Sequence, residues 1–249
     1  LLYFLFDLIM GSEMSLYDIL WRLFTGKAST QLYYIVVLIQ LTILTPWILK
    51  LKRREMLYLV TPVYLIYVYS YNAIVHERPA LYETLFPAWL FFFILGMDCS
   101  EGKFDNIIKK VSGAWVLIGL AVSIIESLLL IDIWGCSVLF AQSQIKFGSF
   151  LYACSLALLF AKYNAKYENN KNVLTVMGDY SYGIYLSHMI VMFFVKKVLY
   201  KLIEDRIWLI DFSSCFVGTV VGTLLLDALI KVITPKLKID KFANKAFGI

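Results

Sequence analysis

The sequence consists of long apolar blocks separated by short polar segments. A helix needs roughly 20 apolar residues to cross a bilayer, and seven blocks approach that length. They cover residues 31–49, 56–75, 82–97, 114–131, 147–161, 179–199 and 207–233. Only 16% of the 249 residues are charged and 61% are hydrophobic, whereas a soluble domain has about 25% charged residues. We therefore predict an all-α, polytopic helical membrane protein with about seven full transmembrane helices.

The first residues contain a shorter apolar block. Residues 1–10 are apolar but too short to span a bilayer, and no initiator methionine precedes them. We expect them to be the last part of a membrane helix in a chain that has lost its natural N-terminus. Residues 15–24 combine apolar residues with a few polar ones, which predicts an amphipathic helix lying in the membrane interface. We expect residues 1–249 to form a single transmembrane domain, with residues 235–249 as a basic cytoplasmic tail.

The positive charges indicate an orientation. Of the 23 Lys and Arg residues, 15 lie in the segments 50–54, 103–110, 162–171 and 231–245, which would be on one side of the membrane if every block spans it. Loops rich in Lys and Arg stay in the cytoplasm, so we expect a cytoplasmic C-terminus. No basic stripe interleaved with aromatics is present, which argues against a nucleic-acid partner. No metal-ligand cluster or glycine-rich phosphate loop is present in the sequence, so we expect no metal and no bound cofactor.

A polar motif opens the sixth block, and it contains one of the two histidines. At helical spacing, Gly178, Ser181, Tyr185, His188 and Met192 fall on one face. Small residues allow another helix to approach closely, and polar tips are costly in lipid. We therefore expect this face to meet other helices.

Three segments carry a resemblance to a known family. The motif Gly178-Asp-Tyr-Ser-Tyr-Gly-Ile-Tyr-Leu-Ser-His188 resembles the late-helix signature of membrane acyltransferase family 3. Residues 31–46, which end in Pro46 and follow the turn at residues 20–26, are similar to the middle block of that family. The segment Phe92-Phe-Ile-Leu-Gly96 is similar to its Phe-rich helix.

The resemblance implies an integral membrane O-acyltransferase. Such an enzyme would take acetyl or a similar acyl group from acetyl-CoA or another acyl-CoA. The acceptor would be a hydroxyl of a saccharide or cell-envelope glycan, and the location would be the inner membrane of a bacterium. The family commonly has ten helices, and its catalytic histidine lies in the first. That histidine would lie upstream of Leu1, so no catalytic residue can be assigned, and we expect residues 1–249 alone to be inactive.

The motif residues are candidates for supporting functions. His188 could transfer a proton or donate a hydrogen bond near the acyl group, or it could simply bond across helices. Ser181, Tyr182 and Tyr185 could orient a substrate carbonyl or hydroxyl, or they could be structural. Glu126 lies inside an apolar block, where a carboxylate must face a cavity or a partner, and functional and structural interpretations both remain open.

Other polar groups allow further hypotheses. Asp227 could line a path or pair with Lys231. The turn His76-Glu-Arg78 could meet a glycan acceptor or be a solvated turn. The basic clusters at residues 50–54 and 236–245 could attract acyl-CoA or anionic lipid, or they could only set the topology. The alternatives to the enzyme are a transporter or flippase-like carrier that uses Glu126 and Asp227, and an inactive remnant of the family.

Overall fold

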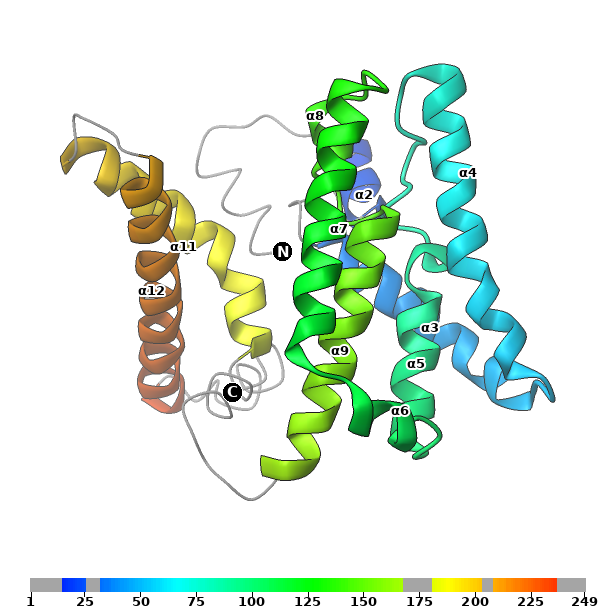
Figure 1. Ribbon diagram of the computed structural model, residues 1–249. Coiled ribbons are helices and arrows are strands. Elements are labelled where there is room, and N and C mark those ends of the chain that lie inside the picture. The colour runs from blue at the N-terminus through cyan, green and yellow to red at the C-terminus, as the bar shows by residue number, and fades with distance from the viewer. Residues whose placement is uncertain (1–14, 26–31, 168–180, 203–207, 237–249) are drawn as a thin grey trace. The chain divides into compact units, whose positions relative to one another are not determined.

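The computed structural model describes residues 15–25, 32–167, 181–202 and 208–236, and every regular element in these ranges is helical (Figure 1). The predicted all-α class is confirmed for these ranges. The partial helix expected at residues 1–10, Gly178 and nearly all of the basic tail lie outside them. The α-helices are α2 (Leu16–Thr25), α3 (Tyr33–Lys50), α4 (Val60–Val75), α5 (Leu90–Ser100), α6 (Asp105–Lys110), α7 (Gly113–Asp132), α8 (Val138–Ala141), α9 (Phe147–Tyr167), α11 (Ser181–Leu202) and α12 (Trp208–Lys236). Two 3-10 helices, η1 (Arg54–Leu59) and η2 (Phe86–Ala88), precede α4 and α5.

The chain divides into two compact units, Leu1–Glu168 and Asn169–Ile249. The first contains α2 to α9, and the second contains α11 and α12. Each unit is described by itself. The prediction of a single domain stays a prediction.

Three described helical segments are long and apolar enough to cross a membrane: Tyr33–Lys50, Arg54–Val75 and Gly113–Asp132. Shorter apolar stretches are Leu90–Ser100, Phe147–Tyr163 and Asp211–Leu226, so the expected count of about seven spans is not confirmed. The block at residues 82–97 shows why. Its helix α5 begins only at Leu90 and has 11 residues, which at 1.5 Å per residue is about 16 Å.

The amphipathic helix predicted near the N-terminus is present as α2. Its start is a reciprocal cap, in which Ser15 Oγ accepts from the Asp18 backbone N–H at 3.1 Å, and Asp18 Oδ2 accepts from the Ser15 backbone N–H at 3.2 Å. Such a box satisfies donors that the first turn leaves free. This local pairing makes the start of the helix predictable from the sequence.

The polar segments of the first unit alternate between the two ends of its helices (Figure 1). The basic turn after α3 and the segment that contains α6 lie at one end. The segments at residues 76–89 and 133–146 follow the C-terminal ends of α4 and α7, at the opposite end. This alternation agrees with the grouping of loops that the charge count used.

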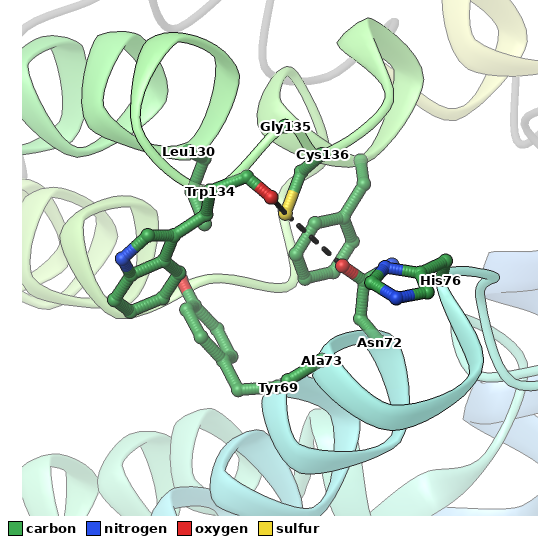
Figure 2. Close-up of a pocket in the computed structure, with 9 residues that line it drawn as sticks. Tyr69, Asn72, Ala73, His76, Leu130, Trp134, Gly135 and Cys136 are labelled. Atoms are coloured by element: carbon green, nitrogen blue, oxygen red, sulfur yellow. Dashed lines mark hydrogen bonds between the residues drawn. The ribbon is translucent and has the colours of Figure 1, made fainter.

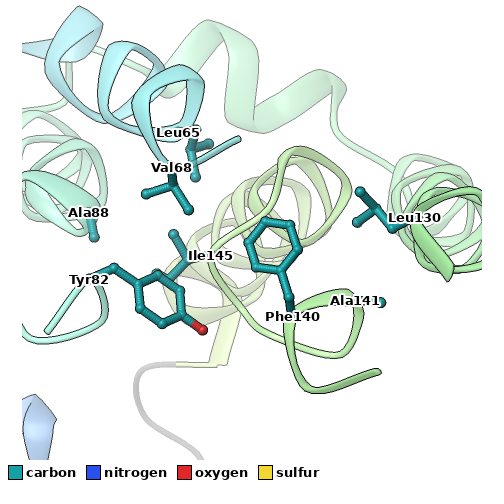
Figure 3. Packing of buried hydrophobic residues seen from close by; sticks show 8 residues of the cluster. All are labelled: Leu65, Val68, Tyr82, Ala88, Leu130, Phe140, Ala141 and Ile145. Carbon is teal, nitrogen blue, oxygen red and sulfur yellow. The ribbon is translucent and has the colours of Figure 1, made fainter. Parts of the chain in front are cut away.

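The main core of the first unit surrounds the segment that joins α7 to α9. Phe140 and Ala141 are fully buried, and Ile145 is almost fully buried. Leu65 and Val68 of α4 pack on one side of this segment and Leu130 of α7 on the other (Figure 3). The connection is therefore folded into the interior of the unit, although its residues 132–146 lie between two of the predicted apolar blocks.

Helices α7 and α9 approach closely because glycines face the partner backbone. A Cβ added at Gly119 would lie 2.9 Å from Tyr152 Cα, and one at Gly148 would lie 2.5 Å from Ser123 Cα. The hydroxyls of Ser123 and Ser149 are 3.3 Å apart across the same contact. Small residues at a helix contact are what packing between membrane helices requires.

Candidate functional site

Helices α11 and α12 form a tightly packed pair in the second unit. A Cβ added at Gly218 would lie 2.9 Å from Val195 Cγ1, and one at Gly222 would lie 2.6 Å from Val191 Cγ1. Gly218 and Gly222 are four residues apart, so they lie on one face of α12 and let α11 approach. The sequence analysis did not use this Gly-x-x-x-Gly spacing, which is a readable signal for such a contact.

A groove with a volume of about 840 Å³ runs between these two helices. Ser181, Tyr185, His188 and Met192 of α11 line it together with residues of α12. The predicted motif face therefore turns toward a partner helix, as the spacing indicated. For Tyr182, whose side chain lies outside the described residues, the structure gives no position.

The hydrogen bonds of His188 determine which of its nitrogens carries a proton. Its Nδ1 lies 2.8 Å from the Tyr185 carbonyl oxygen and 3.1 Å from the Ile184 carbonyl oxygen. Carbonyl oxygens only accept hydrogen bonds, so Nδ1 donates, and in the neutral ring Nε2 carries the lone pair. The imidazole can then accept a hydrogen bond through Nε2 on the lining of the groove.

The α12 wall of the groove contributes hydroxyl groups opposite the motif. Thr219 Oγ1 is buried and has no hydrogen-bond partner among the described residues. Thr223 is fully buried, and its Oγ1 donates to the Thr219 carbonyl oxygen at 2.9 Å. A buried hydroxyl without a partner loses the free energy of a hydrogen bond, so Thr219 offers a polar contact to whatever occupies the groove. The sequence analysis missed both threonines.

Glu126 belongs to the first unit, and its carboxylate is held on two sides. The Tyr69 hydroxyl donates to Oε1 at 2.5 Å, and the Gly148 backbone N–H donates to Oε2 at 2.6 Å. Gly148 lies in the first turn of α9, where backbone donors lack partners within the helix. Glu126 therefore ties α4 to α7 and caps α9, which supports the structural interpretation. Asp227, the other intramembrane acid, has its side chain outside the described residues.

An ionic cluster lies at the end of the first unit where the basic loops gather. Asp98 is buried and accepts hydrogen bonds from Arg54, from the Tyr58 hydroxyl at 2.7 Å and from Lys103 Nζ at 3.0 Å. The Glu101 carboxylate contacts Arg54 at 2.5 Å and Lys103 at 2.9 Å. The hydrogen bond from Arg54 lowers the pKa of the Glu101 carboxyl the most, and the one from Lys103 lowers it further. Arg54 is thus neutralised, and only the other cations of the 50–54 cluster remain for an anionic ligand.

Comparison with known proteins gives one match. A family model described as an acyltransferase domain matches residues 1–228 of the chain. The matched range includes the groove of the second unit, Glu126 and the ionic cluster. No curated protein and no solved structure matches the chain.

Proposed function

The chain belongs to acyltransferase family 3, and from this membership we propose that it is part of an integral membrane O-acyltransferase. The enzyme transfers acetyl or a similar acyl group from acyl-CoA to a hydroxyl of a saccharide or cell-envelope glycan. In this reaction the hydroxyl oxygen bonds to the thioester carbonyl carbon and the carbon–sulfur bond breaks. The hydroxyl proton ends on the departing sulfur, so that CoA leaves as its free thiol.

The observation that carries the proposal is the extent of the family match. It covers residues 1–228 of 249, and it therefore includes the membrane-length helices and the His188 motif. The helical segments Tyr33–Lys50, Arg54–Val75 and Gly113–Asp132 are long and apolar enough for an enzyme that acts within a membrane. The location that follows from the proposal is the inner membrane of a bacterium, with the C-terminus in the cytoplasm.

The two ends of the first unit differ in a way that suits a donor on one side and an acceptor on the other. The cations Lys50, Lys52 and Arg53 are exposed at the end where α4 begins, and Lys109 and Lys110 precede α7 at that same end. Acyl-CoA carries several phosphate charges, and clustered cations attract such a ligand. This is the end that the charge count assigns to the cytoplasm, where acyl-CoA is made.

We assign the groove between α11 and α12 a supporting function in the reaction. His188 Nε2 accepts a hydrogen bond there, and the Thr219 hydroxyl can donate one. These groups can orient a hydroxyl or an amide of a substrate next to the apolar lining. His188 is a positioning residue in this proposal, and the base that takes the hydroxyl proton is not assigned.

The proposal is tested with the full chain as it is naturally encoded, purified into lipid nanodiscs. It is supplied with acetyl-CoA labelled in the acetyl group and with saccharides released from the envelope of the source cells. We expect label in an alkali-labile ester on the saccharide.

His188→Ala should reduce the transfer rate by about tenfold or more, since positioning contributes strongly to rate, and His188→Asn should recover part of it. Val217→Leu, at an exposed position of α12 that does not line the groove, is the control. Absence of any ester in the wild-type reaction would refute the proposal.

A further inference from the structure

A second cavity lies in the first unit, between the C-terminal ends of α4 and α7. Its volume is about 320 Å³, which is within the usual range for a small-ligand site. Nine residues from α4, the end of α7 and the segment after α7 line it (Figure 2). They are Tyr69, Asn72, Ala73, His76, Leu130, Trp134, Gly135, Cys136 and Phe140.

The segment after α7, which contributes Trp134, Gly135, Cys136 and Phe140 to the lining, returns into the helix bundle. Gly148 lies against Ser123, as the close approach of α7 and α9 shows. Lys146, just before it, is buried, and its Nζ donates to the Ser123 carbonyl oxygen at 3.0 Å. Ser123 is nine residues before the end of α7 at Asp132, so the chain descends about 14 Å along that helix. Irregular backbone at such a depth occurs where protein buries it or where it lines a watery cavity.

The lining combines aromatic faces with polar groups that are already oriented. The ring centroids of Tyr69 and Trp134 are 6.3 Å apart, and those of Tyr69 and Phe140 are 5.6 Å apart. Asn72 is buried and fixed, because its Oδ1 accepts from the Cys136 thiol at 3.1 Å and its Nδ2 donates to the Glu77 carbonyl oxygen at 3.2 Å. Trp134 is 63% exposed, so its side chain is accessible to a ligand at the rim.

The electrostatics of the cavity favour a neutral donor of hydrogen bonds. The nine lining residues include no Asp, Glu, Lys or Arg. Two helices end here, and a helix C-terminus presents free carbonyl oxygens and a partial negative charge. Phosphates of CoA would be repelled, while sugar hydroxyls could donate to these acceptors. The carbon-bound hydrogens on one face of a sugar ring can pack on an aromatic ring such as Trp134.

We propose that this cavity binds one saccharide unit of the acceptor, with Trp134 as the stacking surface and His76 as a hydrogen-bonding group at the rim. The identification of the ligand as a saccharide rests on the proposed function. The cavity lies at the end of α4 and α7 opposite the basic loops. It thus places acceptor recognition on the face away from the acyl-CoA end.

The backbone at His76 makes a sharp test possible. His76 ends α4 with φ 57°, in the left-handed region that favours glycine. Its backbone N–H donates to the Asn72 carbonyl oxygen at 2.8 Å, and a glycine could make the same bond. Replacing His76 with Gly therefore preserves or improves the helix end while it removes the imidazole. A purely structural His76 would tolerate that change fully.

Three variants of the full, naturally encoded chain in nanodiscs test the site: His76→Gly, Trp134→Leu and the control Trp115→Leu. Trp115 lies on α7, the helix that precedes Trp134, is 59% exposed and does not line the cavity. Binding of saccharides released from the source cells' envelope is measured by saturation-transfer NMR without any acyl-CoA, and choline serves as a cationic probe. Acceptor KM and acetyl-CoA KM are then measured in the transfer assay.

We expect His76→Gly and Trp134→Leu to weaken saccharide binding and to raise the acceptor KM by about fivefold or more, the size of a lost hydrogen bond or ring contact. The acetyl-CoA KM and the Trp115→Leu values should not change. Saccharide binding that both variants retain would overturn the site even if transfer occurs. So would binding of choline in preference to the saccharides. Saccharide binding that the variants abolish would support the site even if no transfer is found, in which case only the proposed reaction fails.

Discussion

At the scale of single residues, Glu126 shows how an intramembrane acid can be structural. Its carboxylate accepts from the hydroxyl of Tyr69 on α4 and from the backbone N–H of Gly148 on α9. A carboxylate at a helix N-terminus also interacts favourably with the helix dipole. The sequence could locate Glu126 in an apolar block, but it could not show which donors would reach it. Those donors come from residues 57 and 22 positions away in the chain.

This assignment predicts a coupling between Glu126 and Tyr69. Glu126→Gln should destabilise the protein by about 1–3 kcal/mol, because the two hydrogen bonds lose a charged acceptor. Tyr69→Phe should cost less, and the double variant should cost less than the two single changes together. Denaturation of the detergent-solubilised protein gives the three values. Strict additivity would contradict a direct Tyr69–Glu126 bond.

The surface cluster around Glu101 predicts a pH dependence. The pKa of Glu101 lies below its ordinary value of 4.5, because Arg54 and Lys103 bond the charged carboxylate. A lowered folded-state pKa adds stability that is present above the ordinary value and is lost as the pH falls through the folded value. The melting temperature of wild type should therefore fall more between about pH 5 and about pH 3 than that of Glu101→Gln. Parallel curves for the two proteins would contradict the bonding of Glu101.

At the scale of elements, the contact between α7 and α9 depends on glycine. Gly148→Ala would place a Cβ 2.5 Å from Ser123 Cα, so the backbones of α7 and α9 must move apart to make room for it. We expect a loss of about 1–3 kcal/mol in the free energy of unfolding. Gly96→Ala is the matched control, because a Cβ at Gly96 has no heavy atom within 4 Å. That variant should be neutral or gain up to about 1 kcal/mol from helix propensity. Equal effects of the two changes would contradict the close approach.

Helices could be predicted from the sequence where a local pattern decides them, and not where long-range packing does. The apolar blocks at residues 31–49 and 114–131 predicted α3 and α7 to within a few residues. The amphipathic helix predicted at residues 15–24 is α2, whose start the Ser15–Asp18 pair caps. The helix expected at residues 82–97 begins late, because Leu81 has φ 59° and a 3-10 turn containing Pro87 comes before Leu90. The fold of residues 133–146 into the core depends on contacts with α4 and α7, which no local pattern reveals.

The candidate site was predictable in part for the same reason. Helical spacing alone put Ser181, Tyr185 and His188 on one face, and the structure places them along one groove. The opposite wall, with Thr219 and Thr223, depends on how α12 packs against α11. That packing follows from the contacts of Gly218 and Gly222 with valines of α11. The spacing of these glycines could have been read, but the identity of the partner helix could not.

At the scale of the whole molecule, the two ends of the helices in the first unit suit two different substrates. Basic loops gather where α4 and α7 begin, and an aromatic cavity without Asp, Glu, Lys or Arg in its lining lies where they end. The positive-inside rule predicts that the first end is cytoplasmic. The acyl donor would then approach from the cytoplasm and the acceptor from the opposite face.

The most direct test of the central claim is acyl transfer in sealed membrane vesicles of known orientation that contain the full, naturally encoded chain. Labelled acetyl-CoA, which cannot cross the bilayer, is supplied outside either inverted or right-side-out vesicles, with envelope saccharides on both sides. We predict alkali-labile label on the saccharides only with inverted vesicles, whose outer surface is the cytoplasmic face. Label from right-side-out vesicles alone would contradict the assigned orientation. Absence of labelled saccharide in both would contradict the proposal that the protein is an O-acyltransferase.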